Sequence, residues 1–398
     1  MRIVIRDLGA EGHRPKHSPP FDGSRKMARL ATGMLFCLAL ASWAQTPDPQ
    51  EGDQNKSWKA TTESEGSGNT NPTRTIESHT QSGNRTVDKQ SVQRRGPNGN
   101  FEPFQDIEKE SVQVNATTVR TVVRTFATDG KGQKTLVQMT EEEKRTLPGG
   151  NGTVERTTSN PDLNGRFVVV RREIQDTKKT SPDGEETKTT VLLPGGNGGL
   201  APAIEVQESR KKVGDHTVEF QKSTLFPDGN GNWQIGEARQ GTIKEDGKNR
   251  VAEEHVSRPG SDGKLAEVSR TVSKESASGS GEKRNTIETY SSDVPGSAPD
   301  GKLHLVERVT TAGRTGSSGG QITEKQVENV NPGDPGAGLR VTATTTDTVR
   351  AGASGTQATR TIQVRDANGN LGVVAVDTTK SDNVHTVQVD IAPATKPK

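Results

Sequence analysis

Three patterns of polar residues in this chain could carry chemistry, and each would need a particular structural context. Residues 316–320 read Gly-Ser-Ser-Gly-Gly and match the Gly-x-Ser-x-Gly pattern of serine hydrolases. That pattern presents a nucleophile only where a strand precedes the serine and a helix follows it. Here it stands where a glycine-rich turn is expected between two strands. We interpret it as a turn, and we predict no enzyme activity and no catalytic residue.

The histidines do not form a metal-binding pattern. Those after residue 44 are His79, His216, His255, His304 and His385, and none lies near another in the sequence. The only cysteine, Cys37, lies far from them. Because zinc sites need clustered histidine and cysteine ligands, we interpret each histidine as a solvent-exposed residue.

Two turns are similar to the first half of a calcium loop. Residues 228–232 and 366–370 both place Asp, Asn and Asn at alternate positions. A complete loop also has glycine at the sixth position and an acidic residue at the twelfth. The first turn has Trp233 and Arg239 there, and the second has Leu371 at its sixth position. We therefore predict no metal site and no cofactor.

The composition excludes several classes of partner. The 53 basic and 51 acidic residues are mixed along the chain, and no basic cluster with interleaved aromatic residues stands out, so nucleic acid is not an expected partner. Carboxylates are too evenly spread to select a glycosidase pair, and Trp58, Trp233 and Tyr290 are too scattered for a sugar platform. The partner stays unknown, with an extracellular polymer or a cell-surface component as a candidate.

Glycine-centred turns recur at a nearly fixed spacing along the chain. Gly99, Gly132, Gly165, Gly198 and Gly231 are 33 residues apart, and the spacing loosens only after Gly263. Proline, Asp, Asn and Gly are the residues that tight turns select. A period of this size is typical of tandem-repeat architectures. The turn at 366–371 also resembles the Asp-x-x-Gly-x-Leu core of tyrosine-aspartate hairpin repeats, but Arg365 replaces the tyrosine and we assign no family.

The segments between the turns favour strands. They are rich in Val, Thr and Ile, as in residues 117–123 and 341–346, and show no sustained helical spacing. We therefore predict an all-β fold, an elongated tandem repeat of antiparallel β-hairpins with a thin-cored meander sheet or solenoid-like array. Only 27% of residues are hydrophobic and many strands are polar on both faces, so an unfolded chain is the alternative.

An outer-membrane barrel was the other all-β alternative for an exported chain. It would show lipid-facing apolar alternation and aromatic girdles. With 3% aromatic residues the sequence argues against this reading, and we expect no membrane span in the mature chain.

A secretory signal is predicted near the N-terminus. Basic residues precede the apolar run 30–40, and Ser42 to Ala44 offers a cleavage site. Residues 1–44 would be leader and signal peptide, with the start at Met27 and the cut after Ala44. Cys37 would be an inert part of the signal, with lipidation as the alternative, although Phe36 precedes it. The protein would be exported to the periplasm, the cell surface or the medium.

These observations together predict a domain order and a role. Residues 45–65 would be a flexible polar linker, residues 66–392 the hairpin array, with a closing hairpin around residues 381–382, and residues 393–398 a disordered tail. We expect a non-enzymatic exported repeat protein with a structural or adhesive role at the cell envelope or outside the cell. The alternative is an extracellular glycan- or polymer-binding module.

Overall fold

The computed structural model describes residues 55–65, 72–129, 131–278, 281–316, 319–352, 355–366 and 368–381. Contacts divide the chain into Met1–Asp53 and Gln54–Lys398, and all described residues belong to the second unit. The predicted signal peptide, the 393–398 tail and the second strand of the predicted closing hairpin lie outside the described residues. In the described part, no helix is long and apolar enough to cross a membrane.

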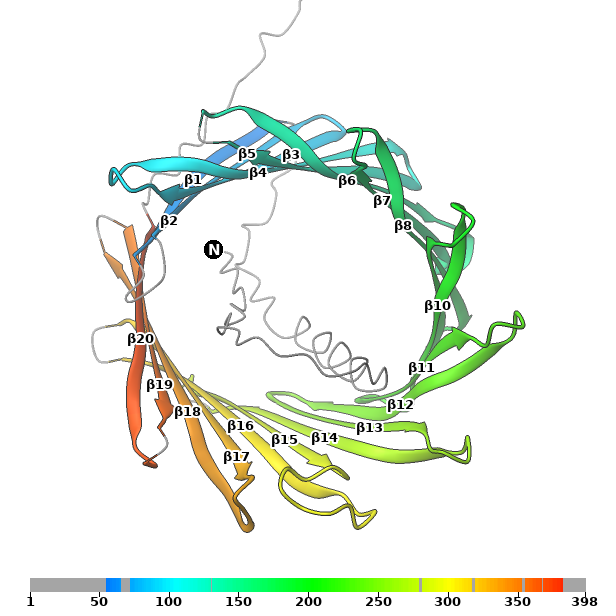
Figure 1. The fold of residues 1–398 in the computed structure, drawn as a ribbon, viewed down its shortest axis with the longest axis vertical. Coiled ribbons are helices and arrows are strands. Elements are labelled where there is room, and N and C mark those ends of the chain that lie inside the picture. The colour runs from blue at the N-terminus through cyan, green and yellow to red at the C-terminus, as the bar shows by residue number, and fades with distance from the viewer. Residues whose placement is uncertain are drawn as a thin grey trace, which may run out of the picture. The chain divides into compact units, whose positions relative to one another are not determined.

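Twenty antiparallel strands make up the described unit (Figure 1). They are β1 (Asn55–Glu65), β2 (Thr73–Ser82), β3 (Arg85–Arg95), β4 (Phe101–Asn115), β5 (Thr118–Thr128), β6 (Lys134–Thr146), β7 (Gly152–Pro161), β8 (Phe167–Ser181), β9 (Gly184–Pro194), β10 (Leu200–Lys212), β11 (Thr217–Pro227), β12 (Trp233–Asp246), β13 (Asn249–Pro259), β14 (Leu265–Ala277), β15 (Lys283–Ser291), β16 (His304–Thr315), β17 (Gln321–Asn331), β18 (Asp334–Gly352), β19 (Gly355–Arg365) and β20 (Leu371–Ser381).

Each strand pairs with its neighbour in the sequence, so the predicted antiparallel hairpin meander is confirmed. The predicted open array is wrong, because β1 also pairs with β20 and closes the sheet into a barrel. Four residue pairs form this seam, from Thr62 opposite Ser381 to Glu65 opposite Thr378. Residues 55–65, which the sequence assigned to a linker, form β1. The spacing of 33 residues is therefore the length of one hairpin with its turns, and it does not mark stacked repeats.

The turns of one rim show why glycine and aspartate recur there. In the turn after β7, the Asp162 carboxylate accepts hydrogen bonds from the backbone amides of Asn164 at 2.8 Å and Arg166 at 2.9 Å. Gly165 has a φ of 77°, a left-handed conformation that glycine adopts without steric strain. Equivalent turns follow every odd-numbered strand from β3 to β13, and we call this end of the barrel the glycine rim.

A ring of β-bulges encircles the barrel near the glycine rim. Each even-numbered strand from β4 to β20 carries one extra residue there, opposite the regular strand before it. The extra residues are Phe104, Val137, Val170, Ala203, Gly236, Val268, Val306, Thr342 and Val374. Bulges increase the local twist and are common at the rims of barrels. They also change which residues face each side of the wall.

The barrel wall is a single layer and has no central core of its own. Among the described residues only six hydrophobic side chains are buried, and the most buried, Val191, still has 5% of its surface exposed. Stability must therefore come from backbone ladders and cross-strand side-chain pairs, each worth about 0.2–1 kcal/mol. This arrangement explains how a chain with little apolar material can form a large ordered structure.

Candidate functional site: the inner wall of the barrel

The strand registers divide the wall into two sets of side chains. Directly opposed residues of antiparallel strands share a face. One continuous row joins Ser111 to Thr121, Thr121 to Glu142, Glu142 to Arg156 and Arg156 to Glu173 across five strands. Adjacent residues along each strand belong to the other face.

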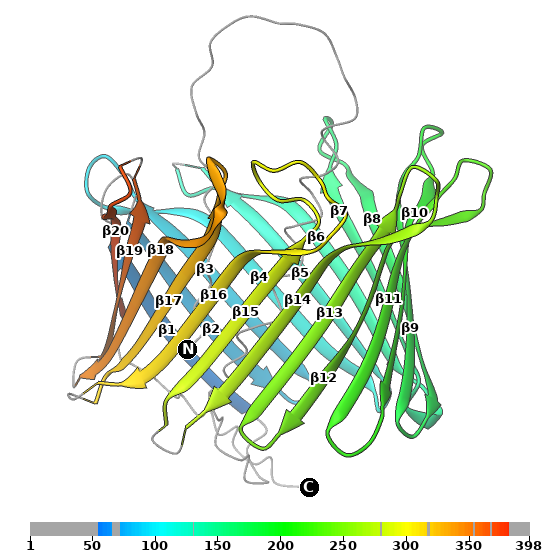
Figure 2. The same ribbon diagram turned by 90° about the horizontal axis from the view of Figure 1, so that it is seen from below.

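The backbone hydrogen bonds show which set faces inward. The Asp162 amide donates to the Arg166 carbonyl at 2.8 Å, so the even-numbered residues at this end of β7 direct their amides toward β8. β12 begins at the glycine rim, and its arrow in Figure 2 points downward, so the glycine rim is the upper rim in that view. On the near side of the barrel, β16, β15, β14 and β13 follow one another from left to right. From outside, β8 thus lies to the left of β7.

The handedness of L-residues completes the assignment. In a strand that runs upward, an L-residue seen from the side of its side chain directs its N–H and C=O groups to the right. From outside, the amides of the even-numbered residues of β7 point left, toward β8. Their side chains therefore point away from that viewer, into the barrel. Arg156 and Thr158 belong to the inner wall, whereas Glu155 and Thr157 face outward.

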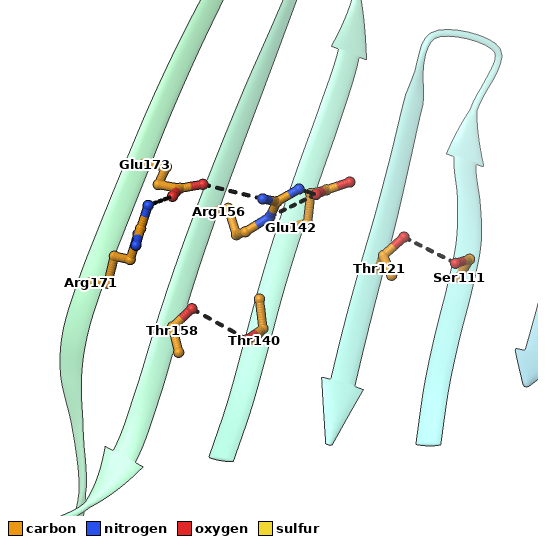
Figure 3. A network of polar contacts seen from close by, with 8 residues as sticks. All are labelled: Ser111, Thr121, Thr140, Glu142, Arg156, Thr158, Arg171 and Glu173. Atoms are coloured by element: carbon orange, nitrogen blue, oxygen red, sulfur yellow. Dashed lines mark hydrogen bonds and ion pairs between the residues drawn. The ribbon is translucent and has the colours of Figure 1, made fainter. Parts of the chain in front are cut away.

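The inner wall carries ion pairs that run across the strands (Figure 3). Arg156 bridges Glu142 on β6 at 2.5 Å and Glu173 on β8 at 3.2 Å. Arg171 contacts the same Glu173. The positive and negative side chains of this network lie on neighbouring strands, so their charges compensate one another.

A second ion-pair network lies on the inner wall at β12 and β13. Arg239 binds Glu237 at 2.6 Å and Glu254 at 2.8 Å, and Arg258 binds Glu237 at 2.8 Å. The Arg239 side chain is only 16% exposed, so the wall holds it firmly. Both signs of charge therefore line the inside of the barrel.

Hydroxyl pairs fill the inner wall between the charged networks. Ser111 and Thr121 lie 3.0 Å apart, and Thr140 and Thr158 lie 3.3 Å apart, each pair joining two strands (Figure 3). Such pairs satisfy one another but leave lone pairs for water or solute. The inner surface therefore carries hydrogen-bonding and ionised groups over these strands, while near the glycine rim it also carries exposed apolar residues such as Val168 and Phe226.

The residues that the sequence singled out for chemistry do not meet at one place. Gly316 and Gly320 form a hairpin turn between β16 and β17, with the Gly316 amide donating to the Gly320 carbonyl at 2.7 Å, and a strand follows the turn. Ser317 and Ser318 lie outside the described residues. This is the turn context that the sequence predicts.

Three of the described histidines lie singly beside carboxylates, and His216 is exposed in the turn before β11. His79 lies 2.6 Å from Asp88, and His304 lies 2.9 Å from Asp300. His255 contacts Glu253 and Glu267 at 3.1 and 2.7 Å. Within the described ranges, no group of three or more potential ligands could hold a metal ion. His385 lies outside those ranges.

The two turns similar to calcium loops use their aspartates for the backbone instead. The Asp228 carboxylate accepts the amides of Asn230 at 2.8 Å and Asn232 at 3.0 Å. These bonds favour the ionised form, so the pKa of Asp228 lies below its usual value, with the Asn230 amide as the largest cause. Asp366 likewise accepts the Asn370 amide at 2.8 Å. Both turns are closed by their own peptide groups.

Comparison with known proteins gives a fold likeness without a family. No described protein family matches the sequence, and no curated protein is similar to it. Solved structures with some likeness include the siderophore receptor PirA from Pseudomonas aeruginosa, with 10% identity, a TM-score of 0.40, and coverage of 84% of this chain and 81% of that one. The FrpB iron transporter from Neisseria meningitidis has 9% identity, a TM-score of 0.40, and coverage of 82% and 74%. The copper transporter OprC has 8% identity, a TM-score of 0.39, and coverage of 84% and 81%. At this level the likeness says nothing about what the chain binds.

Closure of the sheet overturns the expected role. The expected structural or adhesive role rested on an elongated open array, which the β1–β20 pairing excludes. The alternative, a glycan- or polymer-binding module, rested on equivalent exposed side chains of successive repeat units, and the chain forms one closed ring in place of such units. The expectation of no membrane span is likewise at odds with closure, since closed barrels are one of two structures that can cross a bilayer. Export to the cell envelope is compatible with the barrel.

Proposed function

We propose that the protein forms a passage for small hydrophilic solutes at the cell envelope. The observation that supports this proposal is the closed twenty-strand wall with hydroxyl and ionised side chains on its inner face. Barrels of 16–18 strands are wide enough to hold an aqueous channel. A wall of twenty strands is wider than its own side chains can fill.

The mixed charge of the inner wall sets the expected selectivity. Arginines such as Arg156 and Arg239 alternate with the glutamates that they bind, so the local charges largely cancel. A pore lined this way should discriminate weakly between small cations and anions. Removing one arginine would leave its carboxylates uncompensated and draw cations into the passage.

Planar-bilayer recording of the purified protein in KCl gradients tests the proposal. We expect discrete conductance steps with weak selectivity. Arg156→Gln should raise the cation-to-anion permeability ratio, because Glu142 and Glu173 lose their shared partner. Arg172→Gln is the matched control, since Arg172 pairs with Glu155 at 2.7 Å on the outer face of the neighbouring strands. Absence of conductance, or an equal shift from the control, would refute the proposed passage.

A further inference from the structure

The outer face of the barrel changes character between its two ends. Over most of its height this face carries cross-strand ion pairs, such as Arg172 with Glu155, Lys188 with Glu205 and Arg308 with Glu288. Lipid-facing Arg and Lys cost about 2–4 kcal/mol each at a bilayer midplane. This part of the wall is therefore suited to water.

Near the glycine rim the outer face is largely apolar instead, although Asp106, Glu328 and Arg365 lie directly opposite belt residues on the same face. There the bulge ring moves the apolar residues that flank each glycine turn to the outside. We call this set the apolar belt: Phe101, Pro103, Phe126, Leu136, Pro161, Phe167, Val169, Leu192, Pro194, Leu200, Pro202, Leu225, Pro227, Trp233, Ile235, Pro259, Leu265, Tyr290, Leu305, Val330, Leu339, Val341, Leu371 and Val373.

Many belt side chains are exposed to solvent. Ile235 is 39% exposed, Leu265 46% and Val373 56%. From β7 to β12 the outer face of the belt contains no charged side chain, and the first charges beyond it are residues such as Arg172 and Glu205. A contiguous exposed apolar surface of this kind marks an interaction site.

Aromatic residues concentrate in the same place. From residue 72 onward the chain has eight aromatic residues, and seven lie in the strand segments next to the glycine rim. Phe226 faces inward and Phe104 stacks on the inward-facing Arg94. The five that face outward in the belt are Phe101, Phe126, Phe167, Trp233 and Tyr290. Trp and Tyr favour the water–lipid interface, where an apolar ring meets a polar environment.

Arginines accompany the aromatic residues at one edge of the belt. The Arg74 guanidinium, which also pairs with Glu63 at 2.6 Å, lies 4.3 Å from the centre of the Phe101 ring, and Arg95 lies 5.5 Å from it. Basic side chains that stack on apolar ones while keeping their charge in water suit an anionic headgroup layer.

The height of the belt defines how deep it can reach. It covers at most three residues of each strand, and at about 3.3 Å per residue and a strand tilt of about 40° this is ~8 Å along the barrel axis. A complete membrane band is about 25 Å tall, whereas interfacial segments sink about 5–10 Å into the headgroup and acyl boundary. The belt therefore fits the interface of a bilayer and not its full thickness.

We propose that the apolar belt seats the glycine rim in the interface of a lipid bilayer rich in anionic headgroups, with the charged remainder of the wall in water. The occupant of this surface is the lipid itself. The inference does not rest on solute passage. A barrel seated in this way does not cross the bilayer, so flotation without conductance would support the belt and refute the passage, whereas discrete conductance steps would refute this seating.

Flotation with vesicles of phosphatidylcholine and phosphatidylglycerol at a 3:1 ratio tests the belt. The double variant Phe167→Glu/Ile235→Glu places two charges on the outer face and should reduce the floated fraction at least tenfold. The matched control is Val168→Glu/Phe226→Glu, which places two charges on the inner face at the same height and should bind as well as the unaltered protein. Equal loss from both variants, or no flotation of the unaltered protein, would overturn the proposal.

Tryptophan fluorescence gives a second readout that folding defects do not imitate. In a Trp58→Phe background, Trp233 is the only tryptophan after residue 44. Brominated lipids should quench Trp233, and Leu192→Glu should reduce the quenching while Leu193→Glu, on the opposite face, should not. If ultracentrifugation without lipid shows a dimer that Phe167→Glu/Ile235→Glu dissociates, the belt binds a second copy and the lipid proposal is wrong.

Discussion

The seam between β1 and β20 distinguishes a barrel from an open sheet, and a disulfide can test it. Glu63 and Lys380 are directly opposed across the seam. Two cysteines at directly opposed positions come within the 4.4–6.8 Å between Cα atoms that a disulfide requires. The natural chain has one cysteine, Cys37, so the variant Glu63→Cys/Lys380→Cys in a Cys37→Ser background has a single possible intramolecular bond. Oxidation should form it in nearly every molecule.

The expected gain in stability follows from the length of the closed loop. For a loop of about 320 residues the chain-entropy relation gives about 6 kcal/mol, and measured disulfides commonly contribute about 2–4 kcal/mol. By comparison, four cross-strand pairs at about 0.2–1 kcal/mol each hold the natural seam. Covalent closure should therefore raise the unfolding free energy measurably, by at least ~2 kcal/mol.

Non-reducing electrophoresis, mass spectrometry and urea unfolding measure this outcome. The oxidised variant should migrate as a monomer of altered mobility and unfold at higher urea concentration than its reduced form. The control pair Glu63→Cys/Val376→Cys is displaced by four residues along β20, about 13 Å, and should not form the bond. If the first pair yields only intermolecular disulfides, or both pairs oxidise equally, the ring closure described above is wrong.

Three further predictions concern the wall and its turns. Gly241→Ala should lower the unfolding free energy by about 1–3 kcal/mol in urea titrations, because an added Cβ would lie 2.0 Å from a backbone oxygen and 2.7 Å from the Phe220 ring; an unchanged midpoint would contradict the packing. Arg360→Lys should cost about 0.5–1 kcal/mol, because it loses the two-point contact with Asp347 at 2.6 and 3.0 Å, and a double-mutant cycle with Asp347→Asn should show coupling. The pKa of Asp162 is lowered, chiefly by the hydrogen bond from the Arg166 amide. The ionised carboxylate therefore stabilises the folded state above the unfolded-state pKa of about 3.9, and this stabilisation is lost as the pH falls through the lower folded-state pKa. The melting temperature should therefore fall less between pH 5 and pH 2 in Asp162→Asn than in the natural chain. Identical plots of melting temperature against pH would contradict this role of the Asp162 carboxylate.

The sequence allowed the strands and their turns to be predicted, because both depend on local residue types. Glycines such as Gly165 supply the left-handed turn, and β-branched runs such as residues 167–170 fit a pleated surface. Closure could not be predicted in this way. It depends on the pairing of residues 62–65 with residues 378–381, which are far apart in the sequence and have no distinctive side chains. The equal spacing of the turns is compatible with both a stack and a ring.

The inner wall and the apolar belt also escaped sequence reasoning. Alternation along each strand is interrupted by the bulge ring, so a simple period of two assigns residues such as Phe167 and Arg171 to one face when they lie on opposite faces. A signal for the belt was nevertheless present. Phe101, Phe167 and Trp233 each follow a turn glycine by two residues, so an apolar position recurs in phase with the turns. The position of a residue relative to the turn glycine therefore predicts which face of the wall it lies on better than alternation along the strand does.

The neighbour-to-neighbour order of the strands has a consequence for how the molecule assembles. Every pairing except that of β1 with β20 joins segments adjacent in the chain, so the sheet can grow by successive addition of hairpins. Only the pairing of β1 with β20 brings distant segments of the chain together. The chain entropy lost in this one closure rises only logarithmically with the length of the intervening chain. Assembly of most of the molecule should thus have the speed typical of low contact order. The ring can close only once its last strand is available, because β20 forms the seam with β1.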